Sequence, residues 1–397
     1  MSSAGILLGV DKLRLGPFTF FDITMFLGVL CVLVAFLLVA IPKPQLLLVC
    51  ALAAGLVLFS AGLSLAATAR AETLWFGMKL VYVFGLWLPC FVSYGYWLGL
   101  DPSLFRATGV GVAILGVSAA LQFLFPSVLP MSQEYWGRYT GLTTNPNQLG
   151  TISAAGIPLL MGLWRSENGA WKYVAALGIP AAIVAITLSA SRTGMIGACI
   201  GILAWLLLTL KNRNDRKGGI GSVGVLVTMI AVFLLAKPGA LALDRLARFF
   251  DAGVDATTVA SRLKGMQVAW DSLLASPVFG NGYGAQIEGR DGVVHNAALL
   301  FAHQGGAMGL LAYLLVVVLG MVMLVRLIKN LPSLTENSRR LGQGVAGAML
   351  VILCVMQVSP TLTATETWWF WGLGIAFSVA TGNGVVSRGW LWQTALL

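Results

Sequence analysis

The sequence predicts an all-α fold, a polytopic membrane helix bundle with about 11–12 transmembrane helices that forms one domain over residues 1–397. Hydrophobic residues make up 58% of the chain and charged residues only 10%, whereas a soluble domain carries about 25% charged residues. The apolar residues form continuous runs, not the short alternating segments of a membrane β-barrel. Because a helix satisfies its own backbone hydrogen bonds in hydrocarbon, such runs predict spanning helices.

Eleven runs have the ~20 mostly apolar residues that a spanning helix needs. They cover 18–40, 45–68, 75–98, 104–126, 146–164, 171–190, 193–210, 219–236, 306–328, 342–360 and 367–385. An odd number of spans places the two ends of the chain on opposite sides of the membrane. With the basic loops in the cytoplasm the N-terminus would lie outside, so we also allow for a missed or partial twelfth element near that end.

The chain has a net charge of +10, and its Lys and Arg residues lie in short connections between the apolar runs. Nucleic-acid-binding proteins gather Lys and Arg on one soluble face, so we expect no nucleic-acid partner. Short basic loops predict the cytoplasmic side of a membrane protein, and residues 211–217 form the densest one. The opposite, outward side then holds 127–145, the junction at Arg192, the loop 237–294 and residues 361–366.

The loop 237–294 is the only connection long enough to carry structure of its own. Within it, residues 259–275 predict an amphipathic helix whose apolar face carries Met266, Trp270 and Leu273. Ser276 and Pro277 would end that helix, and we expect the glycine-rich residues 280–284 to form a flexible turn.

Two residues on the outward side are our first functional candidates. His295 stands where the long loop meets the next apolar run, and a neutral imidazole there can act as a general base or donate a hydrogen bond to phosphate. The alternative is a helix-start histidine that bonds to nearby backbone. Arg192 lies between two apolar runs, and its guanidinium suits bidentate phosphate binding; the alternative is an arginine that reaches the interface.

Arg262, Arg138, Arg290 and Asn147 complete the predicted site. Arg262 projects from the loop helix, and Arg290 is a weaker candidate of the same kind. The aromatic neighbours of Arg138 fit an interfacial belt as well as a ligand contact. Asn147 belongs to an Asn-Pro-Asn sequence at the start of a helix, which either caps the helix or holds an anion.

His303 follows on the next helix, about 80° around from His295 at 100° per residue, and we interpret it as a packed histidine. The outward side carries no pair of close carboxylates and the chain no phosphate-binding glycine loop, so we expect neither a metal nor a nucleotide cofactor. A histidine with several arginines remains, which together suit the binding of a pyrophosphate and the activation of a hydroxyl.

At these residues the chain resembles the O-antigen ligase and polymerase superfamily. The ligase signature H-[NSQ]-x9-G-x2-[GTY] matches His295, Asn296, Gly306 and Gly309. Upstream, in order, lie similar N-P-N, S-R-T-G, R-x7-W and P-x-x-G-x-G motifs, at 145–147, 191–194, 262–270 and 277–282. The resemblance covers roughly residues 135–330.

The resemblance implies an inner-membrane glycosyltransferase of the C-type fold whose active site faces the periplasm. The implied donor is a polysaccharide on undecaprenyl pyrophosphate, and the implied acceptor of a ligase is a sugar hydroxyl of lipid A–core. By position, His295 would be catalytic, Arg192 and Arg262 would bind the leaving pyrophosphate, and Arg138 would assist. The family uses no metal.

Other functions remain open at this stage. An O-antigen or exopolysaccharide polymerase uses the same donor with a growing glycan as acceptor, and a protein O-oligosaccharyltransferase is a third relative. From a different class, the chain could be a polysaccharide-lipid transporter. A transporter usually places its charged site near the bilayer midplane between related halves, whereas here the candidates gather at one face.

Overall fold

The protein is described by a computed structural model covering all 397 residues. It describes residues 2–8, 14–15, 18–38, 43–68, 71–99, 101–125, 138–212, 224, 227, 257–285, 294–359 and 365–382. The predicted span 219–236 (apart from single residues), most of the loop 237–256, and Arg290 lie outside this part of the chain.

The described residues form an all-α bundle with one two-residue hairpin, β1 (Arg14–Leu15) and β2 (Phe18–Thr19). The helices are α1 (Ser2–Ile6), α2 (Phe20–Leu38), α3 (Pro44–Thr68), α4 (Ala71–Tyr82), α5 (Leu88–Trp97), α6 (Pro102–Leu124), α7 (Pro146–Ser166), α8 (Gly169–Ser189), α9 (Arg192–Leu210), α12 (Thr257–Ala275), α13 (Ala297–Asn330), α14 (Glu336–Met356) and α15 (Thr365–Gly382). A π-helical turn, Val83–Trp87, joins α4 to α5.

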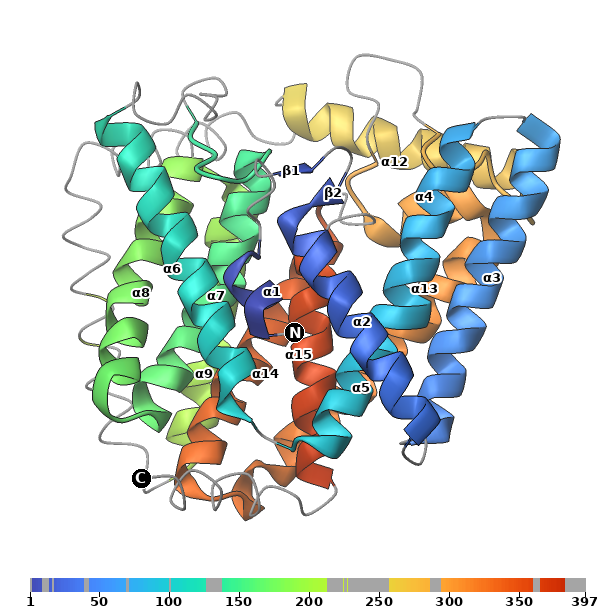
Figure 1. Cartoon of the computed structure of the whole chain (residues 1–397). Coiled ribbons are helices and arrows are strands. Elements are labelled where there is room, and N and C mark those ends of the chain that lie inside the picture. The colour runs from blue at the N-terminus through green and yellow to red at the C-terminus, as the bar shows by residue number, and fades with distance from the viewer. Residues whose placement is uncertain are drawn as a thin grey trace.

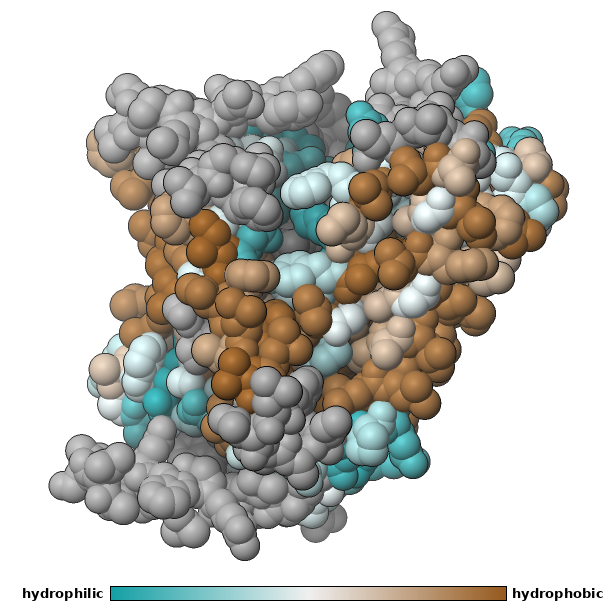
Figure 2. All heavy atoms as spheres, turned by 45° about the vertical axis from the view of Figure 1, so that its right-hand side comes forward, coloured by the Kyte–Doolittle hydropathy of each residue, from teal (hydrophilic) through white to brown (hydrophobic). Residues whose placement is uncertain are grey.

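The long helices run side by side, and α12 lies across their upper end (Figure 1). Seven helices among the described residues are long and apolar enough to cross a membrane. They are Pro44–Ala66, Glu72–Trp97, Pro102–Leu124, Gly169–Ser189, Arg192–Leu210, Ala297–Ser333 and Glu336–Met356. Figure 2 shows apolar residues over much of the middle of one face, as expected for a multi-pass membrane protein.

Helices also form at three further predicted spans, as α2, α7 and α15. Nearly every residue of α7 is buried, because this helix packs against α6, α8, α9 and α14. It therefore lies inside the bundle, which explains how its sequence can hold many small and polar residues.

The predicted starts differ most from the observed ones at three spans. The span expected at 342–360 begins at Glu336. The span expected at 306–328 begins at Ala297 and contains a break at Gly306. The helix expected from residue 75 begins at Ala71. A short additional helix, α1, precedes the first span, where a partial twelfth element was expected. It packs against α6, and its residue Ala4 is fully buried.

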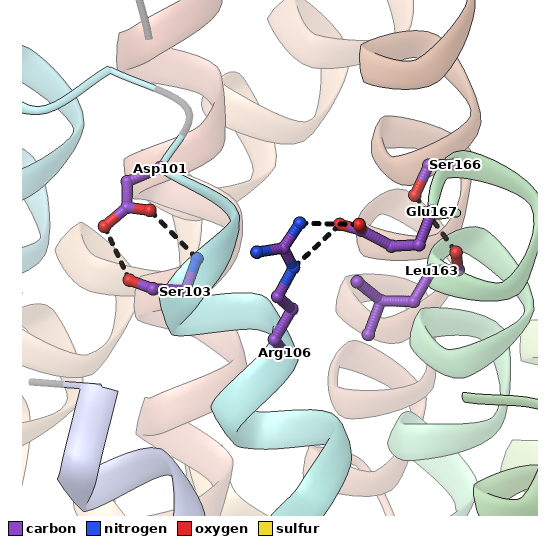
Figure 3. A network of polar contacts seen from close by, with 6 residues as sticks. All are labelled: Asp101, Ser103, Arg106, Leu163, Ser166 and Glu167. Atoms are coloured by element: carbon purple, nitrogen blue, oxygen red, sulfur yellow. Dashed lines mark hydrogen bonds and ion pairs between the residues drawn. The ribbon is translucent and has the colours of Figure 1, made fainter. Parts of the chain in front are cut away.

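The lower end of the bundle is tied together by a buried ion pair, drawn in Figure 3. Arg106 of α6 donates from Nε to Glu167 Oε1 at 3.1 Å and from Nη2 to Oε2 at 2.6 Å. Glu167 is the residue after α7, and its side chain is only 4% exposed. The Arg106 guanidinium also lies 5.3 Å from the ring centroid of Trp171, so α6, α7 and α8 meet at one bidentate contact.

Arg106→Leu is expected to lower the free energy of unfolding by about 3–5 kcal/mol, because it leaves the Glu167 carboxylate buried and unpaired. Thermal unfolding in detergent measures the effect. The double variant Arg106→Leu/Glu167→Leu should recover part of the loss. Glu336→Gln is the control, because it breaks the exposed pair with Arg340 and should cost less than ~1 kcal/mol. Equal losses from both ion pairs would contradict the expectation.

Candidate functional site

Three of the helices that begin at the upper end of the bundle, α7, α9 and α13, begin with a side-chain cap. Asn145 Oδ1 accepts from Asn147 N at 2.7 Å before α7, and Ser191 Oγ accepts from Gly194 N at 3.2 Å before α9. Asn296 Oδ1 accepts from Leu299 N at 2.9 Å before α13. Such caps satisfy backbone donors that a helix start leaves free. The first asparagine of N-P-N, the serine of S-R-T-G and the asparagine after His295 therefore have structural roles.

Arg138 links the start of α7 to the end of α8. Its Nε donates to the Ser189 carbonyl at 2.7 Å and its Nη2 donates to Asn147 Oδ1 at 2.5 Å. The adjacent Tyr139 N donates to the Leu188 carbonyl at 3.1 Å. Arg138 and Asn147 are thus brought together, as the prediction of a shared site requires, and each already has a partner within the protein.

Arg192 is the first residue of α9 and is half-buried. The turn before it is compact, because Ala190 adopts a left-handed conformation with φ 45°. A Cβ on Gly194 would lie 2.9 Å from the backbone of Gly150 in α7. The glycine of S-R-T-G therefore allows α9 to approach α7, and the arginine is left at the exposed edge of that contact.

Arg262 lies on α12 and faces the same region. The side chain is half-buried, and within the described part of the chain its buried Nε has no hydrogen-bond partner. Burial lowers the pKa of the Arg262 guanidinium, and the nearby positive charge of Arg192 lowers it further. Two cations from α9 and α12 therefore repel each other at the edge of the apolar bundle, an arrangement that an anion between them would stabilise.

His295 is half-buried and directly precedes the cap of α13. Asn296 fixes the backbone at this point twice, because its Nδ2 also donates to the carbonyl of Gln357, the residue after α14, at 3.1 Å. The histidine is thus attached to a braced helix start at the same end of the bundle as Arg192.

Gly306, in the second half of the ligase signature H-[NSQ]-x9-G-x2-[GTY], has a structural explanation. Gly306 adopts φ 60° and ψ −154° and breaks α13, a conformation essentially limited to glycine. Residues 277–285, which we call the clasp segment, pair with the broken turn. Asn281 N and Gly282 N donate to the carbonyls of His303 and Gln304 at 3.0 and 2.9 Å, and Ala307 N donates to the Pro277 carbonyl at 2.8 Å.

Glycines permit this contact on both sides. A Cβ on Gly306 would lie 2.4 Å from the carbonyl of Val278, and a Cβ on Gly280 would lie 2.5 Å from Gly306 N. Tyr283 is fully buried beside Gly305 and Gly309, and burial raises the pKa of its hydroxyl. The turn predicted at 280–284 is present, but its backbone is hydrogen-bonded to a transmembrane helix and not free, as a flexible turn would be.

The sequence did not predict a polar cluster that joins α12 to α13. His303 Nδ1 lies 2.8 Å from Ser272 Oγ and 3.4 Å from Asn281 Nδ2, and His303 is 4% exposed. The interpretation of His303 as a packed histidine is confirmed. Ser272 and Asn281 gave no separate signal in the sequence, and the glycines around Asn281 predicted only a flexible turn.

The predicted amphipathic helix is confirmed as α12, but the three residues predicted on its apolar face are not equally buried. Met266 and Leu273 are half-buried, whereas Trp270 is 52% exposed. Arg290 lies outside the described residues, so its predicted contact with substrate stays a prediction.

Comparison with known proteins agrees with the motifs. The family model described as O-antigen ligase matches residues 177–314, from α8 into α13. This range contains Arg192, Arg262, His295 and both signature glycines. No curated protein matches the chain. Over this third of its length the chain is similar to the O-antigen ligase family, which supports membership of the O-antigen ligase/polymerase superfamily.

Proposed function

We propose that this protein is an O-antigen ligase that transfers a polysaccharide from undecaprenyl pyrophosphate to a sugar hydroxyl of lipid A–core. The observation that carries the proposal is the half-buried guanidinium of Arg262, whose buried Nε has no hydrogen-bond partner among the described residues. The positive charge of Arg192, at the start of α9, acts on the same group and lowers its pKa further. A pyrophosphate is the kind of dianion that such a pair would bind, because guanidinium groups match phosphate oxygens bidentately.

In the proposed reaction the bond between the sugar C1 and the pyrophosphate oxygen breaks, and a bond between C1 and the acceptor oxygen forms. Negative charge grows on the leaving pyrophosphate, where Arg192 and Arg262 would stabilise it. His295 would take the proton of the acceptor hydroxyl as the new bond forms. Neither step needs a metal or a nucleotide cofactor, and a chelator should leave transfer unchanged.

The proposal includes the orientation of the protein. The upper end of the bundle would face the periplasm and the lower end the cytoplasm of the bacterial inner membrane, with the loop 237–294 on the periplasmic side. Arg165, Lys172 and Lys211 lie at the lower ends of α7, α8 and α9, in agreement with the excess of positive charge on the cytoplasmic side.

Arg262→Met is expected to weaken binding of undecaprenyl pyrophosphate by about 10- to 100-fold, because it removes hydrogen bonds between charged groups worth ~1.5–3 kcal/mol. The same variant should be more stable than the wild type without ligand, by about 1 kcal/mol, because it removes a buried guanidinium that repels Arg192. Lipid binding in detergent and thermal unfolding measure the two effects.

Lys264→Met is the matched control. It removes the same charge from the same helix, but Lys264 is exposed and should change neither quantity. Unaltered lipid binding in Arg262→Met would contradict the pyrophosphate site, and so would an equal loss in Lys264→Met.

The polymerase is the nearest alternative, since the family includes both activities. Parallel reactions with lipid A–core and with a second lipid-linked glycan as acceptor distinguish them. The ligase should extend only lipid A–core. A peptide acceptor tests the protein O-oligosaccharyltransferase in the same assay.

A further inference from the structure

The exposed surface of α12 divides into an apolar flank and a polar flank. Leu263, Trp270 and Leu274 are 53%, 52% and 64% exposed, and at about 100° per residue they fall within about 40° of one another. Lys264 and Asp271, also exposed, lie about 90° further around the helix.

The third side of α12 faces the bundle. Met266 and Leu273 are half-buried and Ala269 is fully buried, and on the same angular scale they lie about 90° from the apolar flank, opposite the polar one. A helix that lay between protein and water would need one apolar face. This helix has two adjacent ones, and only one of them is covered by the protein.

The apolar flank continues into a surface that already faces lipid. At the end of α12 the chain carries Val278 and Phe279, 42% and 38% exposed. The Phe279 ring packs edge-on against Phe59 of α3, with centroids 6.5 Å apart. Phe59 is itself 55% exposed and belongs to a membrane-spanning helix. The exposed apolar residues that follow α12 therefore lie against an exposed apolar residue of α3, and α12 itself lies across the upper end of the bundle (Figure 1).

We infer that α12 lies in the membrane interface, with Leu263, Trp270 and Leu274 inserted among the lipid acyl chains of the leaflet at the upper end of the bundle. A helix with a charged side toward water and Trp and Leu toward lipid is typical of interfacial helices, and Trp favours this depth. The lipid covers the flank that the protein leaves exposed, and the clasp segment anchors the other end of the helix to α13.

This arrangement has a consequence for the site. Arg262 lies about 80° around the helix from Trp270, so a helix held by lipid on one side and by α13 on another keeps its guanidinium at the depth of lipid head groups. The inference itself rests only on the membrane assignment, not on the transfer reaction.

Spin labels at single cysteines test the inference in the full-length protein. The background has Cys31, Cys50, Cys90, Cys199 and Cys354 replaced by alanine, and the protein is reconstituted in vesicles of phosphatidylethanolamine and phosphatidylglycerol. Leu263→Cys, Trp270→Cys and Leu274→Cys probe the apolar flank, and Lys264→Cys and Asp271→Cys are matched controls on the polar flank. Power saturation compares collisions with oxygen, which concentrates in the bilayer, and with a water-soluble nickel chelate.

The three apolar sites should favour oxygen several-fold over the chelate, and the two polar sites should favour the chelate. Equal access of the chelate to all five sites would place the helix in water and overturn the inference. Protection of the apolar sites from both reagents would also overturn it, because a protein surface would then cover the flank. If one of the other three variants fails to reconstitute, the comparison of Leu274→Cys with Asp271→Cys is sufficient to test the inference, since both side chains are exposed.

Discussion

His295→Ala is expected to lower the rate of glycan transfer by about 10²- to 10⁴-fold, the usual contribution of a general base. Binding of the lipid pyrophosphate donor should stay within about two-fold of the wild type, because the arginines that would hold it lie on α9 and α12. Thermal stability should change little, since Asn296 and not His295 caps α13. Single-turnover transfer and donor binding, measured on the same preparation, separate chemistry from affinity.

The neighbouring residue provides the control for this experiment. Asn296→Ala removes the helix cap and its bond to the Gln357 carbonyl, so it should lower stability by about 1 kcal/mol and reduce transfer only through the displaced backbone. A His295→Ala protein that still transfers glycan at the wild-type rate would remove the proposed base. A variant that instead loses donor binding would make His295 a pyrophosphate ligand.

Gly306→Ala is expected to destabilise the protein by more than about 3 kcal/mol and to abolish transfer. The backbone at φ 60° and ψ −154° costs any other residue roughly 1–3 kcal/mol. In addition, the new Cβ would lie 2.4 Å from the Val278 carbonyl, so the clasp segment must separate from α13. The hydrogen bonds that anchor α12, and with it Arg262, would then be lost.

Two other glycines separate the cost of the backbone conformation from the cost of the collision with Val278. Gly169 has φ 58° with nothing within 4 Å of a Cβ, so Gly169→Ala should show only the conformational cost, about 1–2 kcal/mol. Gly55 has neither a positive φ nor a neighbour within 4 Å, and Gly55→Ala should be neutral or slightly stabilising. Thermal unfolding in detergent ranks the three variants. A Gly306→Ala protein as stable as Gly169→Ala would show that the clasp segment can adjust.

The motifs of the resemblance divide into two physical classes. Asn145, Ser191 and Asn296 cap helices, and Gly194 and Gly306 let backbones approach. The fold therefore explains why the chain has these residues at these positions. Arg192, Arg262 and His295 contribute the cationic and titratable groups among these motifs, and they are the residues to which we assign the chemistry.

The sequence alone was sufficient for the helical membrane bundle, for ten of the eleven predicted spans as helices and for the helix within the long loop. Each depends on local composition and periodicity, since a run of apolar residues in lipid has no alternative to helix. The eleventh run, 219–236, lies outside the described residues. The names of His295, Arg192 and Arg262 as candidates also came from the sequence, because charged or titratable residues are rare beside apolar spans.

Only the tertiary structure decided which of these residues meet. The approach of Arg262 to Arg192 depends on α12 folding back over the bundle, and that depends on backbone hydrogen bonds between the clasp segment and the break at Gly306. The sequence placed Trp270 on one apolar face with Met266 and Leu273, because periodicity marks apolar residues without saying whether protein or lipid covers them. Contacts between residues far apart in the chain carry no local pattern, so neither the clasp nor the second apolar flank of α12 could be predicted from sequence.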